Sequence, residues 1–213
     1  MKPLKVAAGF SLIELMVGLA LGSFIMLGVI SATTGLMRGE AISSAKLDSE
    51  LRNAAFVLQR DISRAGYRGD SVAGLLVGVP NYTSPFNVLG TAVEGCVTYA
   101  YDLNSNGVLD TTGRDERFAI AVHDRVLYLR TGGEDFDCDP ESGSWEPLTD
   151  PALVHVTEFT VSVRDVSTPI PGQTKSIHTR DLTYVLTGKL VKGSALQKQT
   201  LTATIRLQND ILY

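Results

Sequence analysis

The sequence predicts an α+β protein in which one long N-terminal helix precedes a domain of mostly antiparallel strands. Three observations lead to this fold class. The chain has no proline between residues 4 and 79. Its first 65 residues contain an uncharged apolar run and then an apolar stripe at helical spacing. After residue 70, apolar and polar residues alternate in short segments that turn-forming residues separate.

The uncharged run from Leu15 to Met37 is long enough to cross a bilayer as a helix, because 23 residues at about 1.5 Å each match a hydrocarbon core about 30 Å thick. Lys2 and Lys5 precede it, and no acidic residue precedes Glu14. The positive-inside rule then keeps the N-terminus in the cytoplasm and sends the C-terminal part across the membrane. A carboxylate beside such a run is costly, so Glu14 requires a partner.

Residues Gly9 to Glu14, with the sequence GFSLIE, closely resemble the prepilin processing motif of type IV pilins and type II secretion pseudopilins. The resemblance implies that prepilin peptidase cuts between Gly9 and Phe10 and that Phe10 becomes the N-methylated first residue. It also implies that Glu14 pairs with the terminal amine of a neighbouring subunit, which would satisfy its charge. A signal peptide or signal anchor is the alternative, although the apolar run is longer than that of an ordinary signal peptide.

The helix is predicted to continue beyond the apolar run. Apolar residues recur at steps of 4, 3, 4, 4 and 3, which is the spacing of one helix face. These residues are Leu47, Leu51, Ala54, Leu58, Ile62 and Ala65. Gly66 offers a stop, so we expect one helix from about residue 11 to residue 65. Gly18 and Gly22 form a G-x-x-x-G spacing that would allow another helix to approach closely.

Residues 50–69, which end in Ala-Gly-Tyr-Arg-Gly, resemble the corresponding stretch of the PilW-type minor pilins. In that family a cysteine often follows the last glycine, whereas Asp70 stands here. The resemblance covers residues 1–70 well and the rest loosely. It implies a pilin-like organisation: a leader over residues 1–9, a membrane or fibre-core half of the helix over 10–37, an amphipathic half over 38–66, and a periplasmic β-rich head over 67–213.

The head contains seven segments whose patterning predicts strands. They are Ser71–Val79, Cys96–Tyr101, Arg117–His123, Arg125–Arg130, Thr157–Asp165, Arg180–Lys192 and Gln199–Gln208. The short gap His123-Asp124-Arg125 predicts a tight hairpin, and Gly193-Ser194 predicts a second one.

Cys96 and Cys138 are the only cysteines of the chain. After export the head would lie in the periplasm, where a disulfide between them would persist. The bridge would close a loop of about 43 residues and contribute at most about 4 kcal/mol by the chain-entropy estimate. Two free thiols are the alternative.

Residues 102–110, with the sequence DLNSNGVLD, match the first nine places of an EF-hand-type calcium loop. The twelfth place holds Gly113 instead of a glutamate, and Asp115 or Glu116 could substitute in a longer loop. The alternative is an Asx-rich turn, because Asp, Asn and Gly are also turn formers. Ca²⁺ is therefore a candidate cofactor, with ligands from Asp102, Asn104, Asn106, the Val108 carbonyl and Asp110.

Composition and motifs disfavour two large classes of function. The 213 residues carry 19 basic and 23 acidic side chains, a net charge of −4, so we do not expect a nucleic-acid-binding protein. The sequence lacks a G-x-S-x-G elbow, a glycine-rich nucleotide loop and an H-E-x-x-H motif. We therefore expect a protein that is not an enzyme.

The resemblance implies a minor pilin of a type IV pilus that helps to initiate assembly at or near the tip. It would be stored in the bacterial inner membrane and then enter the fibre. Its partners would be prepilin peptidase, other minor pilins, the major pilin, the inner-membrane assembly platform and, as a further candidate, a tip adhesin. A type II secretion pseudopilin of the J type is the first alternative. A signal-anchored periplasmic calcium-binding module is the alternative from another class.

Overall fold

The structure is a computed structural model of the chain, and it describes residues 11–69, 84–91, 93–133, 136–172, 176–192, 198–209 and 211–212. Gly9, Phe10 and the predicted strand Ser71–Val79 lie outside these residues. The chain divides into two compact units, Met1–Ser44 and Ala45–Tyr213, and the boundary falls inside a helix. The amphipathic half of that helix therefore belongs largely to the same compact unit as the strands.

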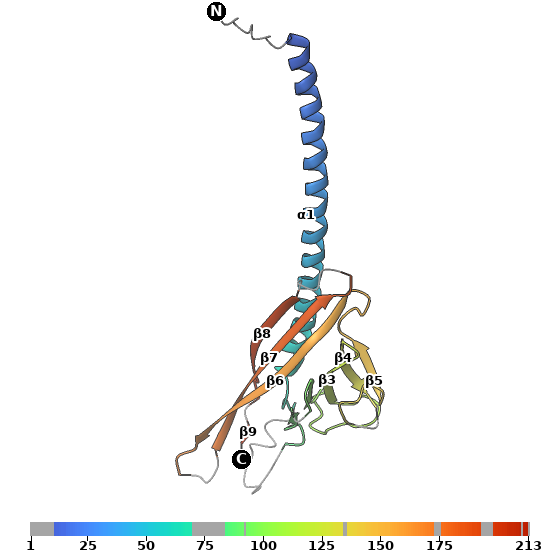
Figure 1. The fold of residues 1–213 in the computed structure, drawn as a ribbon. Coiled ribbons are helices and arrows are strands. Elements are labelled where there is room, and N and C mark those ends of the chain that lie inside the picture. The colour runs from blue at the N-terminus through green and yellow to red at the C-terminus, as the bar shows by residue number, and fades with distance from the viewer. Residues whose placement is uncertain are drawn as a thin grey trace, which may run out of the picture. The chain divides into compact units, whose positions relative to one another are not determined.

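The helix α1 runs without a break from Leu12 to Ile62, which confirms the single long helix that the sequence predicts (Figure 1). A turn over residues 63–66 follows it. Gly66 has a φ of +82°, a left-handed conformation that glycine adopts without steric cost and that commonly ends a helix.

The apolar part of α1, Leu12–Thr34, is 23 residues long and apolar enough to cross a membrane. Its large side chains are exposed in the isolated chain. The hydroxyl groups near its end are satisfied within the helix, because Ser31, Thr33 and Thr34 each donate a hydrogen bond to a carbonyl oxygen four residues earlier. A helix whose backbone and hydroxyl groups bond internally is suited to an apolar surrounding.

The second unit contains two antiparallel sheets (Figure 1), which confirms the α+β class. The first has the strand order β1-β2-β3-β4-β5. Its strands are Leu89–Gly90, Cys96–Ala100, Arg117–His123, Val126–Gly132 and Ser144–Pro147. The second has the order β6-β7-β8, and β9 also pairs with β7. Its strands are Val154–Pro169, Ser176–Leu190, Lys198–Arg206 and Ile211–Leu212.

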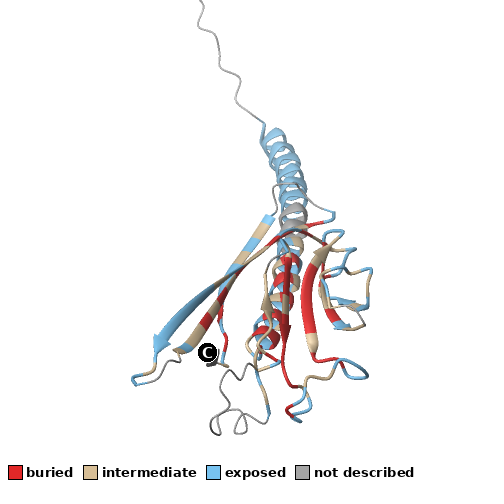
Figure 2. Cartoon of the chain, turned by 90° about the horizontal axis from the view of Figure 1, so that it is seen from below, coloured by how far each residue is buried: buried red, intermediate tan, exposed pale blue. Residues whose placement is uncertain are grey.

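The core of this unit lies between α1 and the two sheets (Figure 2). All six residues of the predicted helix stripe are buried, with at most 2% of their surface exposed. They pack against Val97 and Ile120 of the first sheet and Leu182 and Leu186 of the second. Strand β7 approaches the helix closely at Gly188, where an added Cβ would lie 2.9 Å from a Leu51 methyl carbon.

Six of the seven predicted strands lie among the described residues, and five of them occur with shifted ends. β3 has the predicted bounds, and the hairpin to β4 is tight because Asp124 and Arg125 both adopt positive φ. β6 and β7 are longer than predicted, and the outer part of their hairpin is largely exposed (Figure 2). β1, β5 and β9 were not predicted, because each is four residues or shorter and lacks an alternating pattern.

Candidate functional site

Glu14 lies in the first turn of α1, at one end of an open groove along the helix surface. The groove has a volume of about 700 Å³, and Gly18, Gly22 and Met26 line its length. A Cβ added at either glycine would meet nothing within 4 Å, so the helix backbone is accessible there. The arrangement leaves room for another apolar helix beside a carboxylate that needs a cation. The sequence predicts that Gly9 and Phe10 serve in processing and that Glu14 serves in assembly. Of these three residues, only Glu14 lies in the part of the chain that the structure describes.

The Ala-Gly-Tyr-Arg-Gly segment at the end of α1 joins the helix to the 102–110 loop. The Gly66 N–H donates to the Ala100 carbonyl oxygen at 2.9 Å, and the Asp102 N–H donates to the Tyr67 carbonyl oxygen at 2.9 Å. The Gly69 N–H then donates to Asp102 Oδ2 at 2.9 Å. A Cβ at Gly69 would lie 2.5 Å from Ser105, so only glycine allows this approach. The segment is thus a structural joint.

Asp102 is the centre of the predicted calcium loop and is almost fully buried. Besides the Gly69 bond, its carboxylate accepts hydrogen bonds from the N–H groups of Asn106 at 3.1 Å and Gly107 at 2.7 Å. Burial raises the pKa of Asp102, but these backbone N–H groups outweigh it and hold the pKa below its usual value. The carboxylate is therefore ionised and fixed.

Asn104, Asn106 and Asp110 form hydrogen bonds to one another within the loop. Asn104 Oδ1 accepts from the Asn106 N–H, and Asn106 Oδ1 accepts from the Val108 N–H. Both amide groups donate to Asp110 Oδ2, at 2.7 and 3.1 Å. The structure thus brings together all five residues of the prediction, in a geometry that serves an Asx-rich turn as well as a calcium loop.

Glu116 is the acidic residue that faces this loop. It is fully buried, and its carboxylate accepts hydrogen bonds from the N–H groups of Leu103, Asn104 and Asp110. Asp115, the other candidate for the missing twelfth ligand, points its carboxylate to two arginines instead. Among the described residues, no group of three His, Cys, Asp or Glu side chains is arranged to hold a metal ion. Calcium binding stays a prediction from the sequence.

A buried ionic cluster beside the loop was not predicted. Arg130 is fully buried, and its Nη2 donates to Asp115 Oδ2 at 2.9 Å and to the Gly133 carbonyl oxygen at 2.7 Å. Arg117 Nε bonds the other oxygen of Asp115 at 2.9 Å. Burial raises the pKa of Asp115, but Arg117 and Arg130 outweigh it and lower that pKa. Arg130 and Asp115 are 15 residues apart in the chain, so no local pattern of the sequence indicates that they pair.

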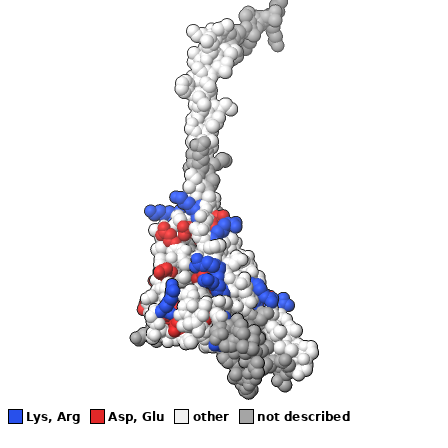
Figure 3. All heavy atoms as spheres, turned by 180° about the vertical axis from the view of Figure 1, so that it is seen from behind, with Lys and Arg blue, Asp and Glu red and all other residues white. Residues whose placement is uncertain are grey.

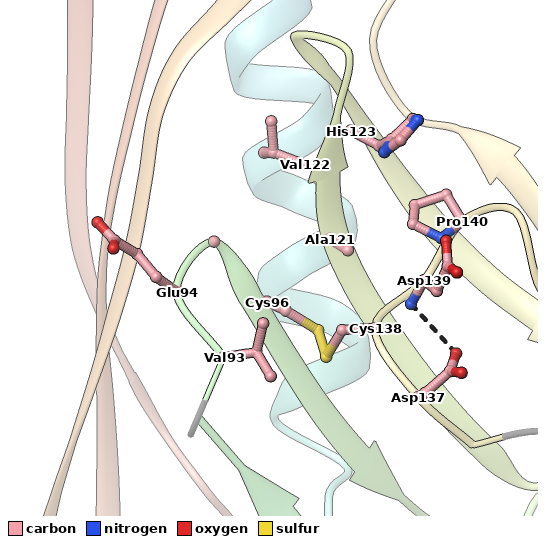
Figure 4. Close-up of a pocket in the computed structure, with 11 residues that line it drawn as sticks. Val93, Glu94, Cys96, Ala121, Val122, His123, Asp137, Cys138, Asp139 and Pro140 are labelled. Carbon is pink, nitrogen blue, oxygen red and sulfur yellow. Dashed lines mark hydrogen bonds between the residues drawn. A yellow bond between two sulfur atoms is a disulfide. The ribbon is translucent and has the colours of Figure 1, made fainter.

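Cys96 and Cys138 form the predicted disulfide, with their Cα atoms 6.1 Å apart (Figure 4). The bridge packs against Ala119, Ala121 and Trp145. It ties the segment before β5 to β2, on the side of the first sheet that does not contribute to the α1 core. An open pocket of about 380 Å³ lies over it.

Comparisons with known proteins agree with the N-terminal motif. Residues 4–30 match the family model described as "Prokaryotic N-terminal methylation motif". Residues 40–207 match the model described as "Prepilin peptidase-dependent protein B". A protein of that description from Escherichia coli (strain K12) is 28% identical over 161 residues, which cover 75% of this chain and 79% of the relative. No solved structure matches the chain.

The two matches confirm the resemblance to type IV pilins that the GFSLIE segment indicates. The motif and the apolar helix that follows it make this a pilin-like, membrane-anchored protein. The longer match covers more than half of the chain and includes strands β1 to β8 of the head. The chain therefore belongs to the family of prepilin peptidase-dependent protein B.

Proposed function

We propose that this protein is a minor pilin of a type IV pilus, a subunit that is processed, stored in the bacterial inner membrane and then used to start fibre assembly. The observation that carries the proposal is the GFSLIE motif, whose last three residues begin the 23-residue apolar helix Leu12–Thr34. Such a helix is suited to a bilayer and also to packing among the apolar helices of a fibre core. Transfer between the two settings requires this property.

Processing follows from the same motif. Prepilin peptidase would cleave between Gly9 and Phe10, and Phe10 would then be N-methylated. The description of the E. coli relative, which names dependence on that peptidase, supports this step. Cleavage before the apolar run leaves the membrane helix in the mature protein.

Glu14 would provide the register of assembly. The amine of a neighbouring subunit would supply the cation that its carboxylate needs in apolar surroundings. The groove past Gly18 and Gly22 would let the neighbouring helix approach closely enough for that pairing. The partners in this role are other minor pilins, the major pilin and the inner-membrane assembly platform, and the role is structural rather than catalytic.

N-terminal peptide mass spectrometry on sheared fibres and on membranes from the native host tests the proposal. We expect an N-methylated Phe10 terminus in the fibre fraction. The same terminus confined to membranes would favour a type II secretion pseudopilin or a purely priming role. An intact leader across Gly9–Phe10 in both fractions, or a cut near Ala32, would contradict processing as a pilin.

A further inference from the structure

We propose that two copies of this chain bind head to tail, with Phe56 of one copy entering the acidic pocket over the Cys96–Cys138 disulfide of the next. The proposal concerns the second unit alone and goes beyond the proposed function. It can be tested on the purified full chain without a fibre. Its failure would therefore leave the processing experiment unaffected.

The projecting surface is the outer face of α1 in the second unit, which we call the α1 ridge (Arg52, Asn53, Phe56, Gln59 and Arg60). All five residues are exposed, and Phe56 exposes 65% of its surface on a helix face opposite the buried stripe. Figure 3 shows Lys and Arg side chains, with Asp and Glu side chains among them, across the head as seen from behind. Aromatic residues and arginine are enriched where a few residues dominate binding.

The two arginines beside Phe56 are held in place before any partner arrives. Arg52 Nε bonds Asp48 at 2.7 Å, and Asp48 in turn accepts a hydrogen bond from Gln199 of β8. Arg60 Nε bonds the buried Asp61 at 2.8 Å. More than half of each arginine side chain nevertheless stays exposed. Ordered side chains lose less conformational entropy on binding, so the α1 ridge is prepared for a contact.

The receiving surface is the pocket over the disulfide, which we call the disulfide pocket (Figure 4). Val93, Ala121 and Pro140 give it an apolar lining beside the disulfide. The carboxylates of Asp137 and Asp139 lie on one side of this lining, and Glu94 lies at its other edge with its side chain directed away from the disulfide (Figure 4). Its volume of about 380 Å³ is larger than one phenyl side chain. An aromatic residue between cations is the complement of such a site in both shape and charge.

The positions of the two surfaces determine the kind of contact. The α1 ridge faces away from the core, and the disulfide pocket lies on the far side of the first sheet from that core. One copy cannot bring its own α1 ridge to its own pocket, and the two patches differ, so the contact is heterologous. Heterologous contacts repeat from copy to copy and generate rings or open filaments. The arginines of the α1 ridge and the carboxylates beside the disulfide pocket belong to the same chain. A second copy of this chain is therefore the partner that enters the pocket.

Photocrosslinking of the full chain in detergent micelles tests the contact directly. We replace Phe56 with p-benzoylphenylalanine and identify the crosslinked peptides by mass spectrometry. A crosslinked dimer that joins residue 56 to residues 93–96 or 136–140 is expected. The same photoreactive residue at Val166, which is 39% exposed on β6, is the control and should give no such product. No dimer, or crosslinks only to other segments or to a different protein in host membranes, would overturn the proposal.

Charge reversal tests the pairing of the two surfaces. Arg52→Glu and Glu94→Arg should each weaken self-association at least about tenfold, and mixing the two variants should restore it. Glu94 is chosen because Asp137 and Asp139 accept hydrogen bonds that hold their own loop. Phe56→Ala should weaken self-association by a similar factor, whereas Val166→Ala should leave self-association unchanged. Single variants that associate like the parent, or a mixture that fails to recover, would contradict the contact.

Discussion

Glu14 is the residue whose partner defines the proposed assembly. Glu14→Ala should leave cleavage between Gly9 and Phe10 largely intact but reduce incorporation into fibres, because the variant no longer attracts the amine of a neighbour. The ratio of protein in sheared fibres to protein in membranes measures this effect. Glu50→Ala, on the same helix but outside the apolar segment, is the matched control. Normal incorporation of the Glu14 variant would contradict the mechanism.

Asp102 and Asp115 make the stability of the head depend on pH. Both have a pKa below the usual 3.8, so each contributes stability above that value and loses it as the pH falls through the lowered pKa. The free energy of unfolding should therefore decline from about pH 5 to below about pH 3. Asp102→Asn should cost about 1–3 kcal/mol near neutral pH and flatten the decline. Asp124→Asn is the exposed control, and urea unfolding at several pH values measures both; an unchanged slope would count against this account.

At the scale of elements, the amphipathic half of α1 is held by its buried stripe. Leu58 of α1 is fully buried in the core that the helix forms with the two sheets, so Leu58→Ala should destabilise the head by about 2–5 kcal/mol through lost burial and the cavity that remains. Phe56→Ala removes a larger but exposed side chain from the same helix and should change monomer stability by about 0.5 kcal/mol or less. Thermal unfolding of both variants at low concentration gives the comparison. Equal losses would mean that the stripe does not anchor the helix.

The 102–110 loop is the element whose ligand the sequence alone suggests. Isothermal titration of the full chain with calcium should show binding that Asp110→Ala removes, because Asp110 holds the ninth place of the loop. Magnesium is the control cation, since it demands a smaller and more regular site. No binding at millimolar calcium would identify the loop as an Asx-rich turn. Asp102 and Glu116 would then serve only to hold the turn in place through the hydrogen bonds that they accept.

At the scale of the whole molecule, local patterns were predictable, and the distant pairings other than the disulfide were not. The stripe from Leu47 to Ala65 and strand β3 follow from periodicity, and the GFSLIE motif is contiguous. The division of the strands into two sheets depends on pairings across long stretches of chain. The Gly69–Asp102 bond joins residues 33 apart, and the buried Arg130 needs a partner 15 residues away. No window of sequence shows such contacts.

The disulfide is the covalent link on which the head as a whole depends. It joins residues 42 apart, so its removal frees a long loop in the unfolded chain and should lower stability by at most about 4 kcal/mol. The bridge also packs against Trp145, whose Nε1 donates to the Ser142 carbonyl oxygen at 2.6 Å. Loss of the bridge should therefore loosen β5 before the α1 core. Hydrogen exchange on the Cys96→Ala/Cys138→Ala variant should show faster exchange in residues 136–147 than in β7, and a reductant should change only the parent. Equal exchange in parent and variant would mean that the non-covalent contacts of β5 suffice to hold it.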